Sequence, residues 1–186
     1  MKKRHSELFE WIKVIVVALT VAFLVRTFIF SPIVVDGPSM LPTLEDRDKM
    51  IVNKFTYRFN EPDRFDIVVF HATMKNDFIK RVIGLPGEHV AVEDHQLYID
   101  GEKTAEPFIN GEDVEDDISS FLTSDFTLEE LEGNHETIPN GHVLVLGDNR
   151  NNSTDSRSLG VIPMDEIVGK ASIIFFPFDR MEMIKE

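Results

Sequence analysis

The chain has 186 residues, with 33 acidic and 19 basic side chains and a formal net charge of −14. This length is enough for one domain with a hydrophobic core and a membrane anchor. The absence of cysteine excludes disulfides, zinc–thiolate sites and cysteine nucleophiles. The acidic balance argues against nucleic acid as a partner, because phosphate backbones attract basic surfaces.

The first predicted element is a transmembrane anchor over residues 11–30. Its only charged side chains, Lys13 and Arg26, lie near the ends of the segment, where they can reach lipid headgroups. Twenty helical residues span about 30 Å, the thickness of the hydrocarbon layer. A cleaved signal peptide is the alternative, since basic residues precede the apolar core. We favour a retained anchor because no small-x-small cleavage site follows that core.

The charges that flank the anchor predict its orientation. Residues 1–30 carry five basic and two acidic residues, whereas residues 31–186 carry 14 basic and 31 acidic ones. Basic flanks stay on the cytoplasmic side of a membrane. We therefore expect a single-pass protein of the cell membrane, with residues 1–10 as a cytoplasmic tail and residues 31–186 as an extracytoplasmic domain.

The extracytoplasmic part is predicted to be mainly β, because short apolar or alternating runs recur between turn signals. The expected strands cover residues 33–36, 50–57, 66–71, 78–84, 89–93, 96–99, 142–146 and 170–176. Asp100-Gly101 predicts a hairpin turn. The last run, "ASIIFFPF", predicts a buried central strand, and an apolar edge that enters the membrane surface is the alternative.

Residues 111–136 differ from the rest in charge, with ten acidic residues and no lysine or arginine. Thr127 followed by Glu130 is the capping-box pattern of a short helix before Leu131. We predict that residues 105–140 form a short acidic insertion or cap on the β domain. The segment indicates no chemistry of its own.

The first stretch with a chemical signal is "VVDGPSMLPTL", residues 34–44, which surrounds Ser39. Two prolines fix φ at two points and Gly37 opens conformations that other residues avoid, so the backbone around Ser39 is predicted to hold one shape. An ordinary Gly/Pro turn is the alternative. Ser39 does not lie in a G-x-S-x-G motif, so a nucleophile elbow is not indicated.

The second stretch is "FIKRVIGLPGE", residues 78–88. Successive side chains of a strand point to opposite faces, so either Lys80 or Arg81 must lie among apolar neighbours. Burial lowers the pKa of a lysine, and a neutral lysine can take a proton from a serine hydroxyl. A surface strand with two solvated cations is the alternative.

The third stretch is "GDNRNNSTDSR", residues 147–157. It resembles a calcium loop only loosely, because Arg150 stands where a ligand is needed, so we expect no metal. The stretch is either a polar turn braced by Asp–Arg pairs or a hydrogen-bonding scaffold that orients a catalytic group. The common zinc-protease motif is absent, and six scattered histidines leave a Ser-His-Asp triad as an alternative.

Together these segments resemble bacterial type I signal peptidases of the Gram-positive type, from about residue 10 to residue 176. "DGPSMLPTL" resembles the nucleophile box of that family, "FDIVVF" its core strand, "IKRVIGLPGE" its lysine box and "GDNRNNSTDSR" its Gly-Asp-Asn-Arg box, in the family's order. The resemblance implies a β-rich catalytic domain that removes signal peptides from exported preproteins after small-x-small sites, without metal or cofactor. It also implies contact with the lipid bilayer and proximity to the export channel.

The resemblance further implies a Ser–Lys dyad, in which Ser39 matches the nucleophile and Lys80 the general base. Five further residues match supporting positions: Arg81 beside the base, Ser153 as the hydroxyl that orients the lysine, Asp155 and Arg157 as an ion pair, and Asp148 as a structural acid.

One position departs from the Gram-negative members, in which a serine two residues before the nucleophile helps to bind the oxyanion. This chain has Gly37 there, so oxyanion stabilisation must rest on backbone N–H groups, including that of Ser39. We expect the substrate to add a strand beside residues 33–36, near the pocket-lining candidates Val35, Met40 and Ile79.

Three rival functions fit the sequence less well. Self-cleaving repressor relatives share the Ser–Lys chemistry but carry a DNA-binding module where this chain has its anchor. A membrane-anchored binding protein without turnover would have no use for an intact serine and lysine. Transpeptidases of the sortase type require a cysteine, which the chain lacks.

Overall fold

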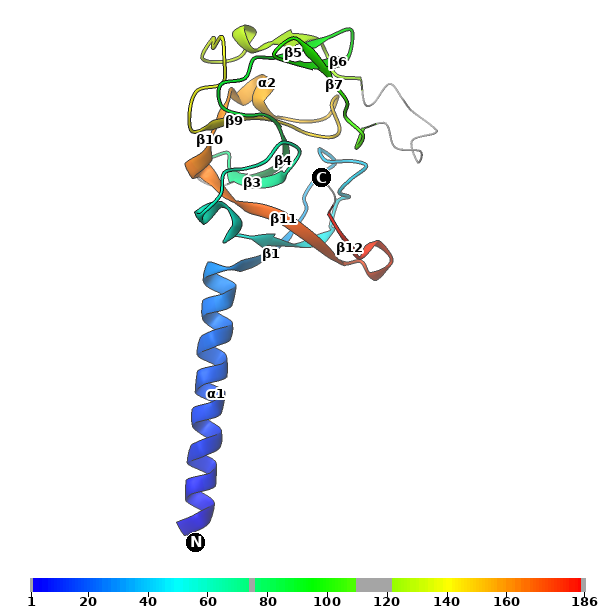
Figure 1. The fold of residues 1–186 in the computed structure, drawn as a ribbon. Coiled ribbons are helices and arrows are strands. Elements are labelled where there is room, and N and C mark those ends of the chain that lie inside the picture. The colour runs from blue at the N-terminus through cyan, green and yellow to red at the C-terminus, as the bar shows by residue number, and fades with distance from the viewer. Residues whose placement is uncertain (1, 74–75, 110–121, 185–186) are drawn as a thin grey trace.

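One long helix stands apart from a β-rich body (Figure 1). The structure, a computed structural model, describes residues 2–73, 76–109 and 122–184, with side chains from residue 9 onward. The mainly β fold with an N-terminal apolar helix is therefore as predicted. Residues 110–121, which hold much of the predicted acidic insertion, lie outside the described residues.

The helix α1 (Lys2–Phe28) carries the predicted anchor. Its segment Phe9–Phe28 has a mean hydropathy of 2.0 and is long and apolar enough to cross a membrane, and none of it is buried against the rest of the protein. The helix ends two residues before the predicted end of the anchor, because Phe30 already pairs with Asn53 in a β-ladder.

The larger sheet is antiparallel, with the strand order β1-β2-β11-β3-β4-β9-β10 and with β12 paired to β11. Its strands are β1 (Phe30–Val34), β2 (Lys49–Asn53), β3 (Ile67–His71), β4 (Asp77–Gly84), β9 (His142–Leu146), β10 (Ile162–Pro163), β11 (Ile167–Phe176) and β12 (Glu182–Met183). β1 is an edge strand, and it follows directly on α1.

The smaller sheet lies at the end of the body farthest from α1 (Figure 1). Its antiparallel strands, in the order β7-β6-β5-β8, are β5 (Val90–Glu93), β6 (Gln96–Ile99), β7 (Glu102–Thr104) and β8 (Phe126–Thr127). Asp100 and Gly101 form the tight turn between β6 and β7, both with positive φ, as the sequence predicted.

Short helices connect the described strands: η1 (Thr56–Arg58), η3 (Leu128–Glu130), α2 (Ser156–Leu159), η4 (Met164–Glu166) and η5 (Phe178–Arg180). The predicted capping box begins η3, where the Thr127 and Glu130 side chains each bond the other residue's backbone. The described part of residues 105–140 thus adds β8 and η3 to the domain, and the insertion as a whole stays a prediction.

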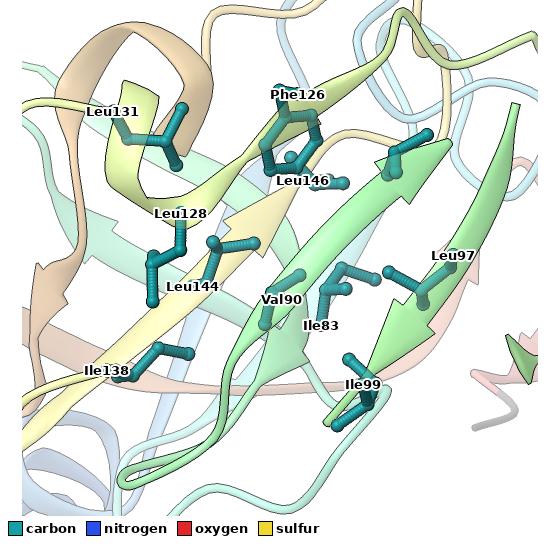
Figure 2. Close-up of a cluster of buried hydrophobic side chains, with 11 residues drawn as sticks. Ile83, Val90, Leu97, Ile99, Phe126, Leu128, Leu131, Ile138, Leu144 and Leu146 are labelled. Atoms are coloured by element: carbon teal, nitrogen blue, oxygen red, sulfur yellow. The ribbon is translucent and has the colours of Figure 1, made fainter. Parts of the chain in front are cut away.

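The core between the two sheets holds the small sheet in place. Val90 and Leu97 of the small sheet point toward Ile83 of β4 and Leu144 of β9 (Figure 2), and all four are almost fully buried. A second cluster packs the loop after β1 against the large sheet, through Val35, Met40, Leu44, Met50 and Val52 among others. This cluster fixes the loop that carries Ser39.

The strand β11 is central, between β2 and β3, but it is less buried than the sequence predicted. Ile173 and Phe176 are 39% and 40% exposed. The ladder to β2 shifts register between Ala171 and Ile173 and again between Ile174 and Phe176. These irregularities turn apolar side chains away from the core near the short β12 hairpin.

Candidate active site

Ser39 and Lys80 lie next to each other although 41 positions separate them. Ser39 is on the loop after β1, and Lys80 is in the middle of β4, where its Nζ donates hydrogen bonds to Ser39 Oγ at 2.7 Å and to the carbonyl oxygen of Ile79 at 2.8 Å. Lys80 is only 4% exposed, whereas Ser39 is half-buried. A serine hydroxyl within hydrogen-bond reach of a buried amine is the arrangement of a nucleophile and its base.

The surroundings of Lys80 lower its pKa from 10.5 to about 8. Burial is the main cause, because it disfavours the charged ammonium, and the carboxylates of Asp155 and Asp148 partly oppose it. No carboxylate among the described residues is within ion-pair distance of Lys80 Nζ. A substantial fraction of Lys80 is therefore neutral near pH 8, as a general base requires.

Arg81, the neighbour of Lys80, is also fully buried. The alternation of strand side chains predicted only one buried cation, but both faces of β4 are covered. Arg81 Nε and NH2 donate to the two carboxylate oxygens of Asp148 at 2.9 and 2.7 Å, and the guanidinium lies 3.9 Å from the ring centroid of Phe108. The Arg81 charge is thus compensated by direct contact, whereas the carboxylates near Lys80 act only from a distance.

The loop that presents Ser39 is fixed by hydrogen bonds from the 147–157 segment. Asn149 donates its backbone N–H to the carbonyl oxygen of Ser39 and its Nδ2 to that of Pro38, both at 3.1 Å. Thr43 Oγ1 donates to Asp148 Oδ2 at 2.6 Å. The backbone around Ser39 is therefore held from outside the loop as well as by its prolines.

Of the two backbone N–H groups predicted to bind the oxyanion, those of Gly37 and Ser39, only one is free to do so. The Gly37 N–H already donates to Asp46 Oδ1 at 2.9 Å, whereas the Ser39 N–H makes no hydrogen bond to any described residue. Gly37 has a φ of +90°, and the backbone of a serine at this position would adopt that angle only with strain. Of the two residues predicted for the oxyanion region, Ser39 is the one with an available N–H.

The Asp155 carboxylate links the two ends of the 147–157 segment. Its carboxylate accepts the Gly147 N–H at 3.0 Å and two bonds from the Arg157 guanidinium, each at 2.8 Å. Burial raises the pKa of Asp155, but Arg157, Gly147 and the Ser153 hydroxyl outweigh burial and lower it. The predicted ion pair of Asp155 with Arg157 is thus present.

Ser153 is placed differently from its predicted role. Its Oγ is buried and close enough to Asp155 to help lower the pKa of that carboxylate, yet it forms no hydrogen bond of regular geometry with Lys80 or with any other described residue. It lines the groove beside Ser39. The role predicted for Ser153, to orient Lys80 through its hydroxyl, therefore stays a prediction.

Sequence reasoning missed several supporting residues. Arg150, 1% exposed, donates from Nε to the Gly147 carbonyl at 3.0 Å and from NH1 to Thr123 Oγ1 at 2.6 Å, and it pairs with Glu106. Asn149 and Arg150 lie inside the motif and could have been selected from it. Thr43 likewise lies inside the quoted stretch 34–44, whereas Phe108 and Glu106 have no local signal, because only the fold brings them to the site.

A groove of about 620 Å³ runs past Ser39 and Lys80. Its lining comes from residues 33–40, Val69, residues 77–80 and residues 151–154, and so includes the predicted pocket residues Val35, Met40 and Ile79. β1 is an edge strand along the groove, and the part of β4 before Arg81 pairs only with β3 among the described strands. Two open strand edges therefore face the same groove.

The alternative of a histidine base finds no geometric support in the described part of the chain. None of the histidines whose side chains are described hydrogen-bonds to Ser39. His71 instead pairs with Asp77, and His89 with Glu129. Within the same described residues, no cluster of three or more His, Asp or Glu side chains could hold a metal ion.

Comparison with known proteins gives consistent matches. The family described as "Signal peptidase, peptidase S26" matches residues 8–176. Signal peptidase I of Bacillus caldolyticus is 43% identical over 96% of this chain and 95% of its own length. Signal peptidase I T of Bacillus subtilis is 42% identical over 99% and 93%, and signal peptidase IB of Staphylococcus aureus is 40% identical over 98% and 95%.

The fold is also similar to a solved structure. A crystal structure of a signal peptidase I from Enterococcus faecalis is 40% identical in sequence, with a TM-score of 0.51. The match covers 60% of this chain and 97% of that chain.

Proposed function

This chain belongs to the signal peptidase family, peptidase S26, as a serine protease that removes signal peptides, and we propose that it does so with Ser39 as nucleophile and Lys80 as general base. The observation that carries the proposal is the 2.7 Å contact between Lys80 Nζ and Ser39 Oγ, together with the lowered pKa of Lys80. Geometry and proton affinity therefore favour the same pair.

The proposed reaction begins when neutral Lys80 takes the hydroxyl proton of Ser39, whose Oγ attacks the scissile carbonyl carbon. The free N–H of Ser39 donates to the oxyanion of the tetrahedral intermediate. The Lys80 ammonium returns its proton to the leaving amine, and an acyl-enzyme remains. Neutral Lys80 then activates a water molecule, which hydrolyses the ester and regenerates Ser39.

We propose that the preprotein binds in the groove in extended form. The open edges of β1 and of the first half of β4 offer backbone partners on both sides of such a segment. Val35, Met40 and Ile79 would form shallow apolar walls that accept small side chains before the cut, which gives the small-x-small preference. Arg81, Asp148, Asp155 and Arg157 would hold the dyad in place.

The proposed setting is the cell membrane, with α1 as a single-pass anchor, its N-terminus in the cytoplasm and residues 31–186 outside. The apolar segment Phe9–Phe28 supports this placement, as does the basic N-terminal flank. An enzyme and a membrane-tethered signal peptide that share the bilayer meet at a raised effective concentration. Proximity to the export channel is part of the same proposal.

The proposal is tested with purified full-length protein in detergent and an exported preprotein as substrate. Wild type, Ser39→Ala, Lys80→Ala and the control Lys103→Ala, at an exposed position of β7, are compared, and new N-termini are mapped by mass spectrometry. We expect one cut after a small-x-small site, lost by at least roughly 10³-fold in both dyad variants and retained in the control.

Two other outcomes would contradict the proposal. Cleavage that survives in Lys80→Ala would mean that the base lies elsewhere. A folded wild type without any cleavage would favour a binding protein that retains the fold without turnover.

A further inference from the structure

A second, smaller pocket lies where α1 meets the β-rich body, and the proposed reaction does not use it. Its volume is about 270 Å³, and we call it the juxtamembrane pocket. It is lined by Thr27, Phe28, Lys54, Tyr57, Arg58, Ile167 and Val168. None of these residues lines the groove of Ser39.

The juxtamembrane pocket lies at the depth at which the apolar helix ends. Thr27 and Phe28 are the last residues of the segment that is apolar enough to cross a membrane. The backbone N–H of Lys54 donates to the carbonyl oxygen of Ile29 at 2.8 Å, so the turn after β2 is tied to the end of α1. In the proposed anchored state this level is that of the lipid headgroups.

Two of the residues that line this pocket are cations, Lys54 and Arg58. Neither is within ion-pair distance of a carboxylate in the described part of the chain. The arginines that support the fold each have such a partner: Arg64, Arg81, Arg150, Arg157 and Arg180. The chain has 33 acidic residues, yet no described carboxylate pairs with these two neighbouring cations. Lys54 and Arg58 therefore form a local positive site.

The turn that carries both cations is held in place by a buried contact. Tyr57, between them, donates its hydroxyl to Asp66 Oδ2 at 2.6 Å. Asp66 is 1% exposed, and Lys170 Nζ lies 2.5 Å from its other carboxylate oxygen. Lys170 compensates the Asp66 charge, so Asp66 does not neutralise the pocket. The two cations are therefore presented from a fixed turn.

Aromatic side chains flank the cations on the same turn. Phe55 and Phe59 are 48% and 75% exposed, and their ring centroids are 5.1 Å apart. Exposed aromatic rings beside basic side chains are typical of segments that lie at the boundary between headgroups and acyl chains. The surroundings of the pocket thus fit a ligand with a negative head and an apolar tail.

We propose that the juxtamembrane pocket binds the anionic phosphodiester headgroup of a membrane lipid, with Lys54 and Arg58 as its phosphate ligands. This inference rests on the proposed membrane anchoring and adds a lipid-binding site to it. A lipid bound there bridges α1 and the β-rich body at the bilayer surface. It sets how the body, and with it the groove of Ser39, is oriented above the membrane.

The test uses purified full-length protein in detergent and native mass spectrometry. Phosphatidylglycerol, phosphatidylcholine and inorganic phosphate are titrated separately. We expect one phosphatidylglycerol to bind in preference to phosphatidylcholine. The variant Lys54→Gln/Arg58→Gln should bind it about 30-fold more weakly, which corresponds to about 1 kcal/mol for each cation near an anionic headgroup.

The matched control is Lys49→Gln/Lys103→Gln, which removes two exposed cations away from the pocket. Lys49 is at the opposite end of β2, about 16 Å from Lys54 at the usual strand rise. This control should bind phosphatidylglycerol like the wild type. If the double pocket variant does not fold, the single change Arg58→Gln, at an exposed side chain, serves in its place, with a loss of about fivefold expected.

Three results would overturn the proposal: no preference for phosphatidylglycerol in the wild type, equal losses in pocket and control variants, or displacement of the lipid by millimolar inorganic phosphate. The last would identify a site for free phosphate. Cleavage of a soluble peptide, assayed in the same samples, reports on the Ser–Lys dyad independently. A failure of the lipid site is thereby distinguished from a failure of the proposed function.

Discussion

Arg81 and Asp148 form an ion pair in which both side chains are completely shielded from solvent, with nitrogen–oxygen distances of 2.9 and 2.7 Å. The pair joins β4, beside Lys80, to the loop that begins at Gly147. Thr43, on the loop after Ser39, bonds to both members. One buried pair therefore connects the three chain segments that carry the candidate active site.

Removal of one member of this pair should strongly destabilise the protein. In Asp148→Ala the Arg81 guanidinium stays buried without its counter-charge, and we expect the free energy of unfolding to fall by about 3–5 kcal/mol. Denaturant unfolding of the purified protein in detergent measures this change. Asp165→Ala, at an exposed position of η4, should change it by less than about 0.5 kcal/mol.

The double variant Arg81→Met/Asp148→Leu removes both charges and should recover part of that loss, since apolar groups of similar size can replace a buried pair. An Asp148→Ala protein that loses less than about 1 kcal/mol would show that the pair is not an important part of the fold.

The pH dependence of cleavage should follow the pKa of Lys80, which is about 8. The neutral amine is the active form, so kcat/KM should fall about tenfold for each pH unit below that value and level off above it. Initial rates with a peptide whose own groups do not titrate between pH 6 and pH 10 give the profile. A rate that stays flat down to pH 5 would exclude Lys80 as the base.

Asp155→Asn should move this profile to lower pH. The Asp155 carboxylate raises the pKa of Lys80, so its neutralisation lets that pKa fall further below 8. The midpoint of the residual kcat/KM profile measures the shift. Asp77→Asn is the matched control, because Asp77 lines the same groove but is not among the charges that raise the pKa of Lys80. Equal midpoints in wild type and Asp155→Asn would contradict the assignment.

Gly147→Ala should impair cleavage more than folding. A Cβ at Gly147 would overlap Ser153 Oγ and lie 2.5 Å from the carbonyl oxygen of Ser39, so the nucleophile loop must shift. A displacement of about 1 Å can cost about 10²-fold in rate, and we expect a loss of that order in kcat. Gly101→Ala, in the remote β6–β7 turn, should affect stability but not kcat. A Gly147→Ala enzyme with wild-type kcat would show that the loop adapts.

The strands of the core could be predicted from the sequence because they are short apolar runs bounded by turn signals. β3, β4 and β9 are examples, since their burial is nearly continuous. β10 and β12 have two residues each, too few for any periodic pattern, and they form only because neighbouring strands offer an edge. Their existence depends on the tertiary fold.

The burial of Arg81 shows a limit of strand alternation as a guide. The pattern assumes that one face of the strand is solvated, but side chains of β4 pack into three different hydrophobic clusters. Ile79, Val82 and Ile83 each belong to a different one of these clusters. Phe108, which covers the Arg81 guanidinium, comes from a segment without a local signal. The pairing of Ser39 with Lys80 followed from family resemblance, because no pattern in the sequence specifies a contact across 41 positions.

Lys80→Met should abolish cleavage and stabilise the fold at neutral pH. The pKa of the Lys80 amine is 10.5 when the side chain is fully solvated, as in the unfolded chain, and about 8 in the folded protein. Between these values the unfolded state binds more protons, so wild-type stability rises with pH across this window, and the full penalty of the buried ammonium is present below pH 8. A methionine of similar length carries no such penalty.

The expected gain in the free energy of unfolding is at most about 3–4 kcal/mol near pH 7, from about 1.4 kcal/mol per pKa unit, and it should shrink as the pH rises from 8 to 10.5. Denaturant unfolding at pH 7 and pH 9.5 measures it, with Lys49→Met as the control at an exposed position. A difference between wild type and Lys80→Met that is the same at both pH values would mean that the lysine keeps an ordinary pKa in the folded protein. The burial of the Lys80 amine is expected to cause both its low pKa and the loss of stability. Without the loss of stability, the low pKa proposed for the general base would have no physical cause.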